Sequence, residues 1–180
     1  MKTIGYITII ILLATSLLTT VDAVYAEEKY EDVLASVVVG SVFQVTVDNS
    51  SLNFGSAESG QRVELYPDRY YNQATCISNH GKTWYLKMYA QNDLVGASSK
   101  YVISRESIEW YVSWTNGSGV KVEGWHNFEE DTPSLVYTSG FEDNYGGEVF
   151  LQFKYALTVP GEATSDSYFT VISYTLTESP

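Results

Sequence analysis

The sequence has few of the residues that most often form catalytic or metal sites. Among 180 residues there are one cysteine, Cys76, and two histidines, His80 and His126. A single cysteine cannot form an intramolecular disulfide, so packing alone has to stabilise the fold. The neighbours of Cys76 are typical of a strand, and this predicts a buried, unreactive thiol.

The motifs of common enzyme classes are also missing. The sequence has no Gly-x-Ser-x-Gly elbow, no histidine pair at metal-ligand spacing and no phosphate-binding loop. Cys76 and His80 are four residues apart, but a nucleophile and its base also need an orienting third group. Carboxylate pairs that hydrolyse sugars stay open, because their separation is spatial and does not show in a sequence. We expect no enzyme and no cofactor.

Positive charge is scarce. Lysine and arginine together number 10 against 22 aspartates and glutamates, which gives a formal net charge of −12. A chain of this charge repels phosphates, so we expect it to bind neither nucleic acid nor anionic lipid.

Long hydrophobic runs are absent except near the start of the chain. Lys2 precedes an apolar run over residues 9–18, and small residues at Ala23 and Ala26 follow it. This three-part layout is typical of a secretory signal peptide over residues 1–26. An uncleaved anchor is the alternative, but the run is shorter than the roughly 20 residues that a spanning helix needs. We expect a mature chain without an integral membrane segment, secreted to the cell surface or the extracellular space, with the periplasm as the alternative location.

The rest of the sequence alternates between apolar and polar residues, which is typical of strands and not of helices. The clearest alternation runs over residues 37–47, 84–90, 108–114, 149–159 and 168–176. Weaker strand candidates cover residues 61–65, 73–78, 120–125 and 134–137. Turn residues separate them, for example Asn116-Gly117, for which we expect positive φ angles. The pattern predicts an all-β fold, an antiparallel Ig-like β-sandwich of about 7–10 strands in a single domain over residues 37–180.

Residues 27–36 are charged and carry no turn signal before the first alternating segment. We expect a flexible mature N-terminus there. The alternative is a donor segment that adds a strand to the sheet edge of a neighbouring copy, as in a strand-complemented fibre.

Two segments of the chain resemble the WxL-type surface domains of bacteria, or a related family of exported Ig-like β-sandwiches. Trp84 and Leu86 form a Trp-x-Leu motif inside an expected strand, and a tyrosine-rich segment with Tyr168, Tyr174 and Leu176 lies near the C-terminus. Tyr174 stands where that family has a second tryptophan. The resemblance implies non-covalent attachment to the cell wall, through peptidoglycan or other surface proteins.

Aromatic residues are abundant, with seven phenylalanines, four tryptophans and fifteen tyrosines. Trp84, Trp110 and Trp114 lie on apolar rows and are expected in the core. Tyrosines on the opposite parity would form one outward face if their strands are neighbours, and a second cluster lies in an expected loop. These candidate ligand-binding residues are Tyr85, Tyr89 and Tyr111, and then Tyr66, Tyr70 and Tyr71.

Acidic loops supply weak calcium candidates, namely Glu129, Asp131 and Asp143. Neither the loop of Glu129 and Asp131 nor the loop of Asp143 has the spaced ligand pattern of a calcium loop, so we expect no metal site.

The sequence thus predicts an exported bacterial surface protein, a structural or adhesive module that binds without catalysis. Its expected partners are cell-wall or surface polysaccharide, or other surface proteins. Carbohydrate or cell-wall binding through an exposed tyrosine face is one alternative, and self-association through edge strands in a fibre is the other.

Overall fold

The computed structural model describes residues 35–65, 72–130 and 132–180. The chain divides into two compact units, residues 1–38 and residues 39–180. Of the first unit only residues 35–38 are described, and they are exposed and outside any strand. All strands of the described residues lie in the second unit.

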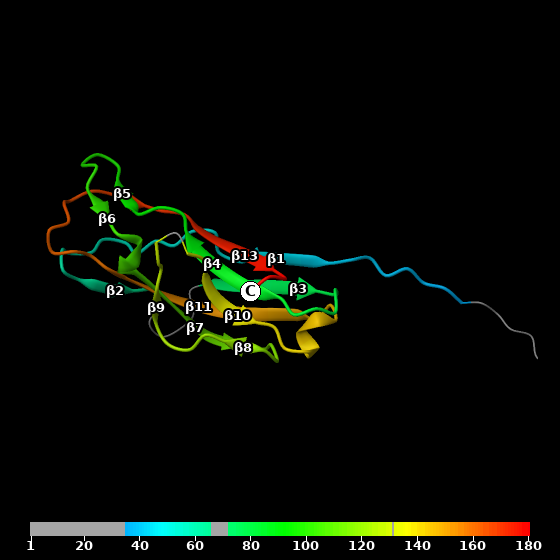
Figure 1. Cartoon of the computed structure of the whole chain (residues 1–180). Coiled ribbons are helices and arrows are strands. Elements are labelled where there is room, and N and C mark those ends of the chain that lie inside the picture. Colours follow the sequence, from blue (N-terminus) through cyan, green and yellow to red (C-terminus); the bar gives the residue numbers. More distant parts are fainter. Residues whose placement is uncertain (1–34, 66–71, 131) are drawn as a thin grey trace, which may run out of the picture. The chain divides into compact units, whose positions relative to one another are not determined.

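Two antiparallel sheets form the body of this unit (Figure 1). The larger sheet has the order β1-β3-β11-β7-β9, and β2 pairs with β11. Its strands are β1 (Phe43–Val47), β2 (Arg62–Glu64), β3 (Asn72–Ser78), β7 (Ile108–Thr115), β9 (His126–Asn127) and β11 (Glu148–Thr158). The smaller sheet has the order β13-β4-β10-β8. Its strands are β4 (Tyr85–Ala90), β8 (Val120–Lys121), β10 (Ser134–Thr138) and β13 (Ile172–Thr177).

Short elements complete the fold. A three-stranded sheet has the order β12-β5-β6, built from β5 (Leu94–Gly96), β6 (Val102–Ile103) and β12 (Tyr168–Phe169). The described residues also form two single 3₁₀ turns, η1 (Arg105–Ser107) and η2 (Glu142–Asn144). Within the described ranges, no helix has the length and apolar character to cross a membrane.

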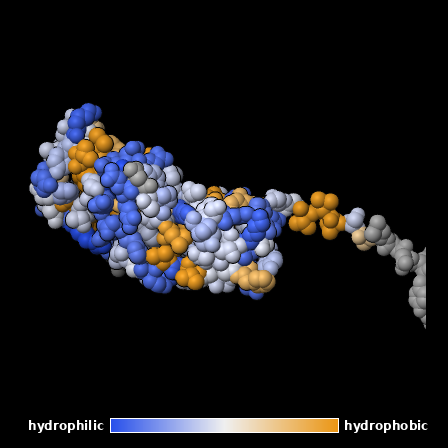
Figure 2. Space-filling view, in the orientation of Figure 1, coloured by the Kyte–Doolittle hydropathy of each residue, from blue (hydrophilic) through white to orange (hydrophobic). Residues whose placement is uncertain are grey.

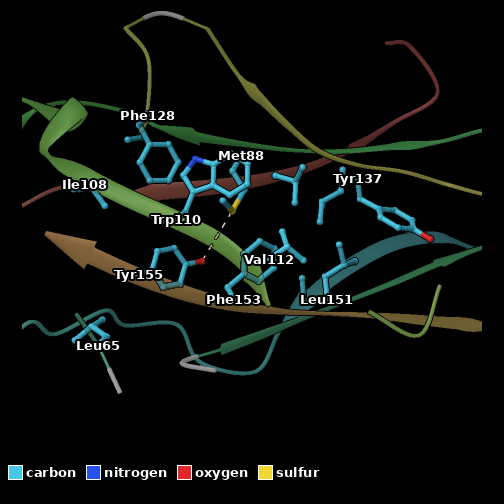
Figure 3. Packing of buried hydrophobic residues seen from close by; sticks show 14 of the residues in the cluster. Leu65, Met88, Ile108, Trp110, Val112, Phe128, Tyr137, Leu151, Phe153 and Tyr155 are labelled. Atoms are coloured by element: carbon cyan, nitrogen blue, oxygen red, sulfur yellow. Dashed lines mark hydrogen bonds between the residues drawn. The ribbon is translucent and has the colours of Figure 1, made fainter. Parts of the chain in front are cut away.

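The core lies between the two main sheets. Side chains from both layers are fully buried and meet one another, as Figure 3 shows for Met88 and Tyr137 of the smaller sheet and Val112, Leu151 and Phe153 of the larger one. The alternation over residues 84–90 is confirmed, because its inward members have no exposed surface; these are Trp84, Leu86, Met88 and Ala90. The prediction of an all-β antiparallel sandwich is confirmed, with six and four strands in its two facing layers.

One tryptophan does not follow the predicted alternation. Trp114 was expected in the core with Trp110, but it is 47% exposed whereas Trp110 is 1% exposed. Strand β7 contains a bulge: Val112 pairs with Phe153 and Trp114 pairs with Gln152, so Ser113 is the extra residue. An extra residue reverses the parity of all later positions in the strand, which turns Trp114 to the outer face.

Other strand predictions need correction at their ends. Val37 and Val39 precede β1 and are 85% and 76% exposed, so they do not extend the first strand inward. The expected last strand is two strands, because β12 pairs with β5 and β13 pairs with β4. The segment over residues 120–125 keeps only the two-residue β8, and β5, β6 and β9 have no counterpart among the predicted strands.

The turn after β7 uses glycine for close packing. Gly117 does not have the expected positive φ, unlike Gly81 and Gly146. A Cβ atom on Gly117 would overlap the Tyr137 hydroxyl oxygen and lie 2.9 Å from a methyl carbon of Val149. A larger residue cannot fit there without displacing Tyr137 from the core.

Candidate functional site

The three tyrosines expected on one face do not share a face. Tyr85 and Tyr89 lie on β4 in the smaller sheet, whereas Tyr111 lies on β7 in the larger sheet. Their side chains alternate with core residues, so they point to opposite outer surfaces of the sandwich. The prediction of one tyrosine face is wrong, because parity along a strand does not reveal which sheet the strand joins.

Tyr89 belongs to a group of side chains that hold the turn after β4. Arg105 donates a hydrogen bond to the Tyr89 hydroxyl at 3.3 Å and another to the carbonyl of Ala90 at 3.0 Å, and it pairs with Asp93 at 3.1 Å. Hydrogen bonds from the Arg105 backbone and side chain hold the pKa of Asp93 below its usual value. These contacts fix the turn after β4.

A different aromatic group forms on the outer surface of the larger sheet. Tyr111 pairs with Lys154 and Trp114 pairs with Gln152, so both side chains face outward on neighbouring positions of β7. Trp125, just before β9, places its ring centroid 5.7 Å from that of Tyr111. We call Tyr111, Trp114 and Trp125 the aromatic face.

Charged side chains surround the aromatic face. The Arg62 guanidinium lies 4.9 Å from the centroid of Trp125 and pairs with Glu109 at 2.5 Å. The Lys121 ammonium lies 5.6 Å from the centroid of Tyr111. Rings flanked by fixed donors and acceptors can stack on an apolar surface and hydrogen bond around its rim. The sequence did not point to Arg62, which lies on β2, or to Trp125, which lies just before β9.

The two Trp-x-Leu-like segments lie side by side. Strands β4 and β13 are antiparallel neighbours in which Leu86 pairs with Leu176 and Met88 with Tyr174. Trp84 and Leu86 are fully buried, and the Trp84 indole donates to the carbonyl of Asp143 at 3.3 Å. Both motifs therefore build the core and do not present a tryptophan to a ligand.

Tyr174 belongs to a buried polar cluster with Tyr155 and Asn72. The two tyrosine hydroxyls are hydrogen bonded to each other, and the Asn72 amide nitrogen donates to Tyr174 at 3.2 Å. Burial raises the pKa of Tyr155 well above its usual value. Asn72 is 2% exposed, yet its carbonyl oxygen Oδ1 has no hydrogen-bond partner among the described residues. Within the described part of the chain, Trp110 Nε1 is the other buried side-chain nitrogen or oxygen without a hydrogen-bond partner.

A pocket of about 470 Å³ opens next to Asn72. Its apolar walls come from the end of β1, the following loop, and the break between β12 and β13; they include Val47, Leu52, Phe54, Leu94, Val171 and Ile172. A second pocket, of about 680 Å³, shares the walls Leu52, Phe54 and Phe169 and continues toward Asp166. Tyr168, expected in the C-terminal motif, lines both pockets.

The acidic candidate Asp143 is engaged in hydrogen bonds within the fold. Its side-chain oxygens accept hydrogen bonds from the Tyr137 hydroxyl at 2.6 Å and from the backbone amides of Ser118 and Gly140 at 2.8 and 2.7 Å. Burial opposes its ionisation, but these bonds outweigh that effect and hold the pKa of Asp143 below its usual value. We call Asp143, Tyr137, Ser118 and Gly140 the closed cluster.

The remaining candidates do not join a site. Glu129 is exposed, and no group of three metal-binding side chains occurs in the part of the chain that the structure describes. Asp131, Tyr66, Tyr70 and Tyr71 lie outside the described residues. Cys76 is fully buried as predicted, and burial raises the pKa of its thiol to about 12.

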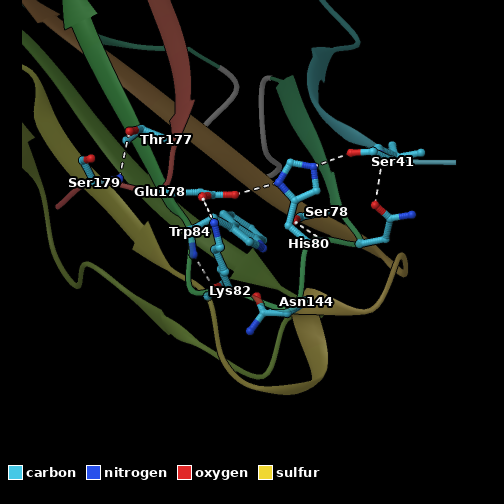
Figure 4. Close-up of polar contacts among 12 residues, drawn as sticks. Ser41, Ser78, His80, Lys82, Trp84, Asn144, Thr177, Glu178 and Ser179 are labelled. Atoms are coloured by element: carbon cyan, nitrogen blue, oxygen red, sulfur yellow. Dashed lines mark hydrogen bonds and ion pairs between the residues drawn. The ribbon is translucent and has the colours of Figure 1, made fainter.

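His80 connects the start of β1 to the end of β13 (Figure 4). Its Nε2 atom lies 2.6 Å from the Ser41 hydroxyl oxygen, and its Nδ1 atom lies 2.6 Å from Glu178, which also pairs with Lys82 at 3.1 Å. Serine nucleophiles use the same order of hydrogen bonds. Neither of the two pockets includes Ser41 or His80. The contacts hold the residues before β1 against the end of β13.

No protein-family model matches the sequence, and no curated protein matches it. Among solved structures, the chain is similar to an ASH / PapD-like domain of human CEP192, PapD-like domain 7, with 11% identity and a TM-score of 0.34. The match covers 82% of this chain and 84% of that domain.

Proposed function

We propose that the protein is an exported surface module that binds polysaccharide through its aromatic face, without catalysis. The observation that carries this is the gathering of Tyr111, Trp114 and Trp125 on one outer surface, beside charged side chains. The leader-like residues 1–26 support export.

The chemistry of the aromatic face fits a sugar ring. The C–H faces of sugars are apolar, and their hydroxyl groups at the rim both donate and accept hydrogen bonds. Trp114 is 47% exposed and Trp125 is 37% exposed, so both rings offer surface to a ligand. Arg62, Glu109 and Lys121 supply the donors and acceptors next to them.

Attachment to the cell wall, as the WxL-type resemblance implies, is a narrower form of this proposal. The adjacency of Leu86 and Leu176 across β4 and β13 supports a shared core for the two motif segments. The wall ligand would then be met by the aromatic face, since Trp84 is buried.

Pull-down on insoluble peptidoglycan and titration with soluble polysaccharide fragments test the proposal. We expect Trp114→Ala to weaken binding about fivefold, the effect of losing one aromatic contact of about 1 kcal/mol. Tyr111→Ala combined with Trp114→Ala should abolish detectable retention. Phe141→Ala is the matched control, because Phe141 is 71% exposed and lies on the loop at η2.

Retention that survives the double substitution would overturn the assignment of the aromatic face. Binding to a surface protein but to no polysaccharide would overturn the ligand class and leave the face as a protein contact. Release of reducing sugar from the polysaccharide would overturn the absence of catalysis.

A further inference from the structure

Three consecutive valines lie just before β1 with almost their whole side chains exposed. Val37, Val38 and Val39 are 85%, 96% and 76% exposed. Figure 2 shows the hydrophobic colour of the segment that leads into β1. Apolar side chains that are adjacent and exposed in a soluble environment mark a contact that a partner completes. We call residues 37–39 the valine segment.

The chain that comes after the valine segment is fixed in place. The Asn79 side chain accepts a hydrogen bond from the Val42 amide at 2.7 Å and donates one to the Gly40 carbonyl at 2.6 Å. The Ser41 hydroxyl oxygen lies 2.6 Å from His80 Nε2. The Phe43 ring stacks on the His80 ring, with the ring centroids 5.1 Å apart. Position 40 is therefore anchored at the end of β1 that is remote from the pocket.

The valine segment cannot enter the pocket of its own copy. Between Phe43 and Val47, which lines the pocket, β1 covers about 13 Å at the usual strand rise. Val39 is one residue from the anchored Gly40, so it reaches at most about 4 Å from it, and Val37 reaches at most about 11 Å. Only another molecule can bring valines of this kind to the pocket.

The pocket has what such a segment needs. Its walls are mostly apolar, and Asn72 Oδ1 is a buried acceptor without a partner among the described residues, which the N–H of an inserted backbone would satisfy. The strands on either side, β1 and β13, are each the end strand of their sheet among the described residues, and they lie beside one another, so the pocket opens where two sheet edges meet.

We propose that the pocket beside Asn72 receives the valine segment of a second copy of this chain. Val37 and Val39, which share one side of an extended segment, enter the apolar walls, and Val38 faces outward. The contact is head-to-tail, because the donating and accepting surfaces differ, so it propagates into a chain of copies and does not close a symmetric dimer. It is independent of the aromatic face.

Sedimentation velocity of the purified protein at increasing concentration tests this. We expect the protein to form a ladder of oligomers. Val37→Asp with Val39→Asp should weaken association at least about a hundredfold, because carboxylates would enter an apolar pocket. Val171→Arg should have the same effect by filling the pocket, and Val171 is 54% exposed, so the fold tolerates it. Val120→Asp is the matched control, an equal change at a valine that is 72% exposed on β8.

Mixing the two defective variants distinguishes this contact from other association. The segment variant keeps an intact pocket and the Val171→Arg variant keeps an intact segment, so together they should form a one-to-one complex and nothing larger. Monomers at all concentrations, an equal loss with Val120→Asp, or a mixture that stays monomeric would each overturn the proposal. Polysaccharide binding should be unchanged in all of these variants, so failure here is separable from failure of the proposed function.

Discussion

The closed cluster and the buried cluster of Asn72, Tyr155 and Tyr174, called here the Asn72 cluster, are both groups of buried polar side chains. They differ in whether every buried polar atom has a hydrogen-bond partner. In the closed cluster Asp143 accepts hydrogen bonds from Tyr137, Ser118 and Gly140, and neither of the two pockets reaches it. In the Asn72 cluster one acceptor has no partner among the described residues, and a pocket lies beside it. A satisfied network stabilises the fold, whereas an incomplete one marks a place where something can be added.

Removing Asp143 should give the largest effect. Asp143→Ala leaves the buried Tyr137 hydroxyl and two backbone amides without an acceptor, and hydrogen bonds to a charged group are each worth about 1.5–3 kcal/mol. We expect the free energy of unfolding to fall by roughly 3 kcal/mol or more, measured by urea denaturation. A loss below about 1 kcal/mol would show that the closed cluster does not stabilise the fold.

A substitution that overfills the space around Tyr137 should lower the free energy of unfolding by less than the loss of Asp143. Gly117→Ala places a Cβ against the Tyr137 hydroxyl oxygen, closer than two unbonded atoms can approach, so the ring or the turn must move. We expect a loss of about 1–3 kcal/mol in the free energy of unfolding. Gly147→Ala is the control, because nothing lies within 4 Å of its added Cβ. Equal effects of the two substitutions would contradict the close packing of Tyr137.

Acid should weaken the closed cluster selectively. In the folded protein, the pKa of Asp143 lies below 3.8, the ordinary value of an aspartate. Its carboxylate therefore stabilises the fold at pH values above that ordinary value, and the contribution is lost as the pH falls through the lowered folded-state pKa. The difference in free energy of unfolding between the protein and Asp143→Asn should be larger at neutral pH than near pH 3. The two proteins share all other carboxylates, so the contributions of those groups cancel in the difference. A difference that grows on acidification would contradict the prediction.

The incomplete cluster should tolerate a change that the closed one does not. Asn72→Leu removes the unpartnered carbonyl and fills part of the pocket with methyl groups, at the expense of the hydrogen bond to Tyr174. We expect the free energy of unfolding to change by less than about 1 kcal/mol. A loss as large as that of Asp143→Ala would show that Asn72 is a structural residue of the same kind.

The sequence predicted the interior of the sandwich well, because burial imposes a strict alternation. The row from Trp84 to Ala90 is inward without exception. The departure at Trp114 depends on the pairing of β7 with β11, and a pairing of strands far apart in the chain has no local signal. The two-residue strands β6, β8 and β9 are too short to show alternation at all.

The candidate sites were predicted only in part. Tyr111 was correctly expected to face outward, but its neighbours Arg62 and Trp125 come from β2 and the segment before β9. Their meeting follows from sheet order, which turn residues do not encode. Asn72 carried no signal in the sequence, since an amide becomes notable only when the surrounding structure leaves one of its atoms without a partner.

The extra residue at Ser113 divides β7 into two parts with different roles, one sealed in the interior and one offered to the surroundings. If the strand kept its length but lost the bulge, Ser113 would pair with Gln152, and Trp114 would move to the opposite face, toward the interior. The outer surface would lose one exposed ring, while Tyr111, which precedes the bulge, would keep its orientation. The orientation of the Trp114 indole thus depends on the pairing of β7 with β11 and not on the identity of the tryptophan's neighbours.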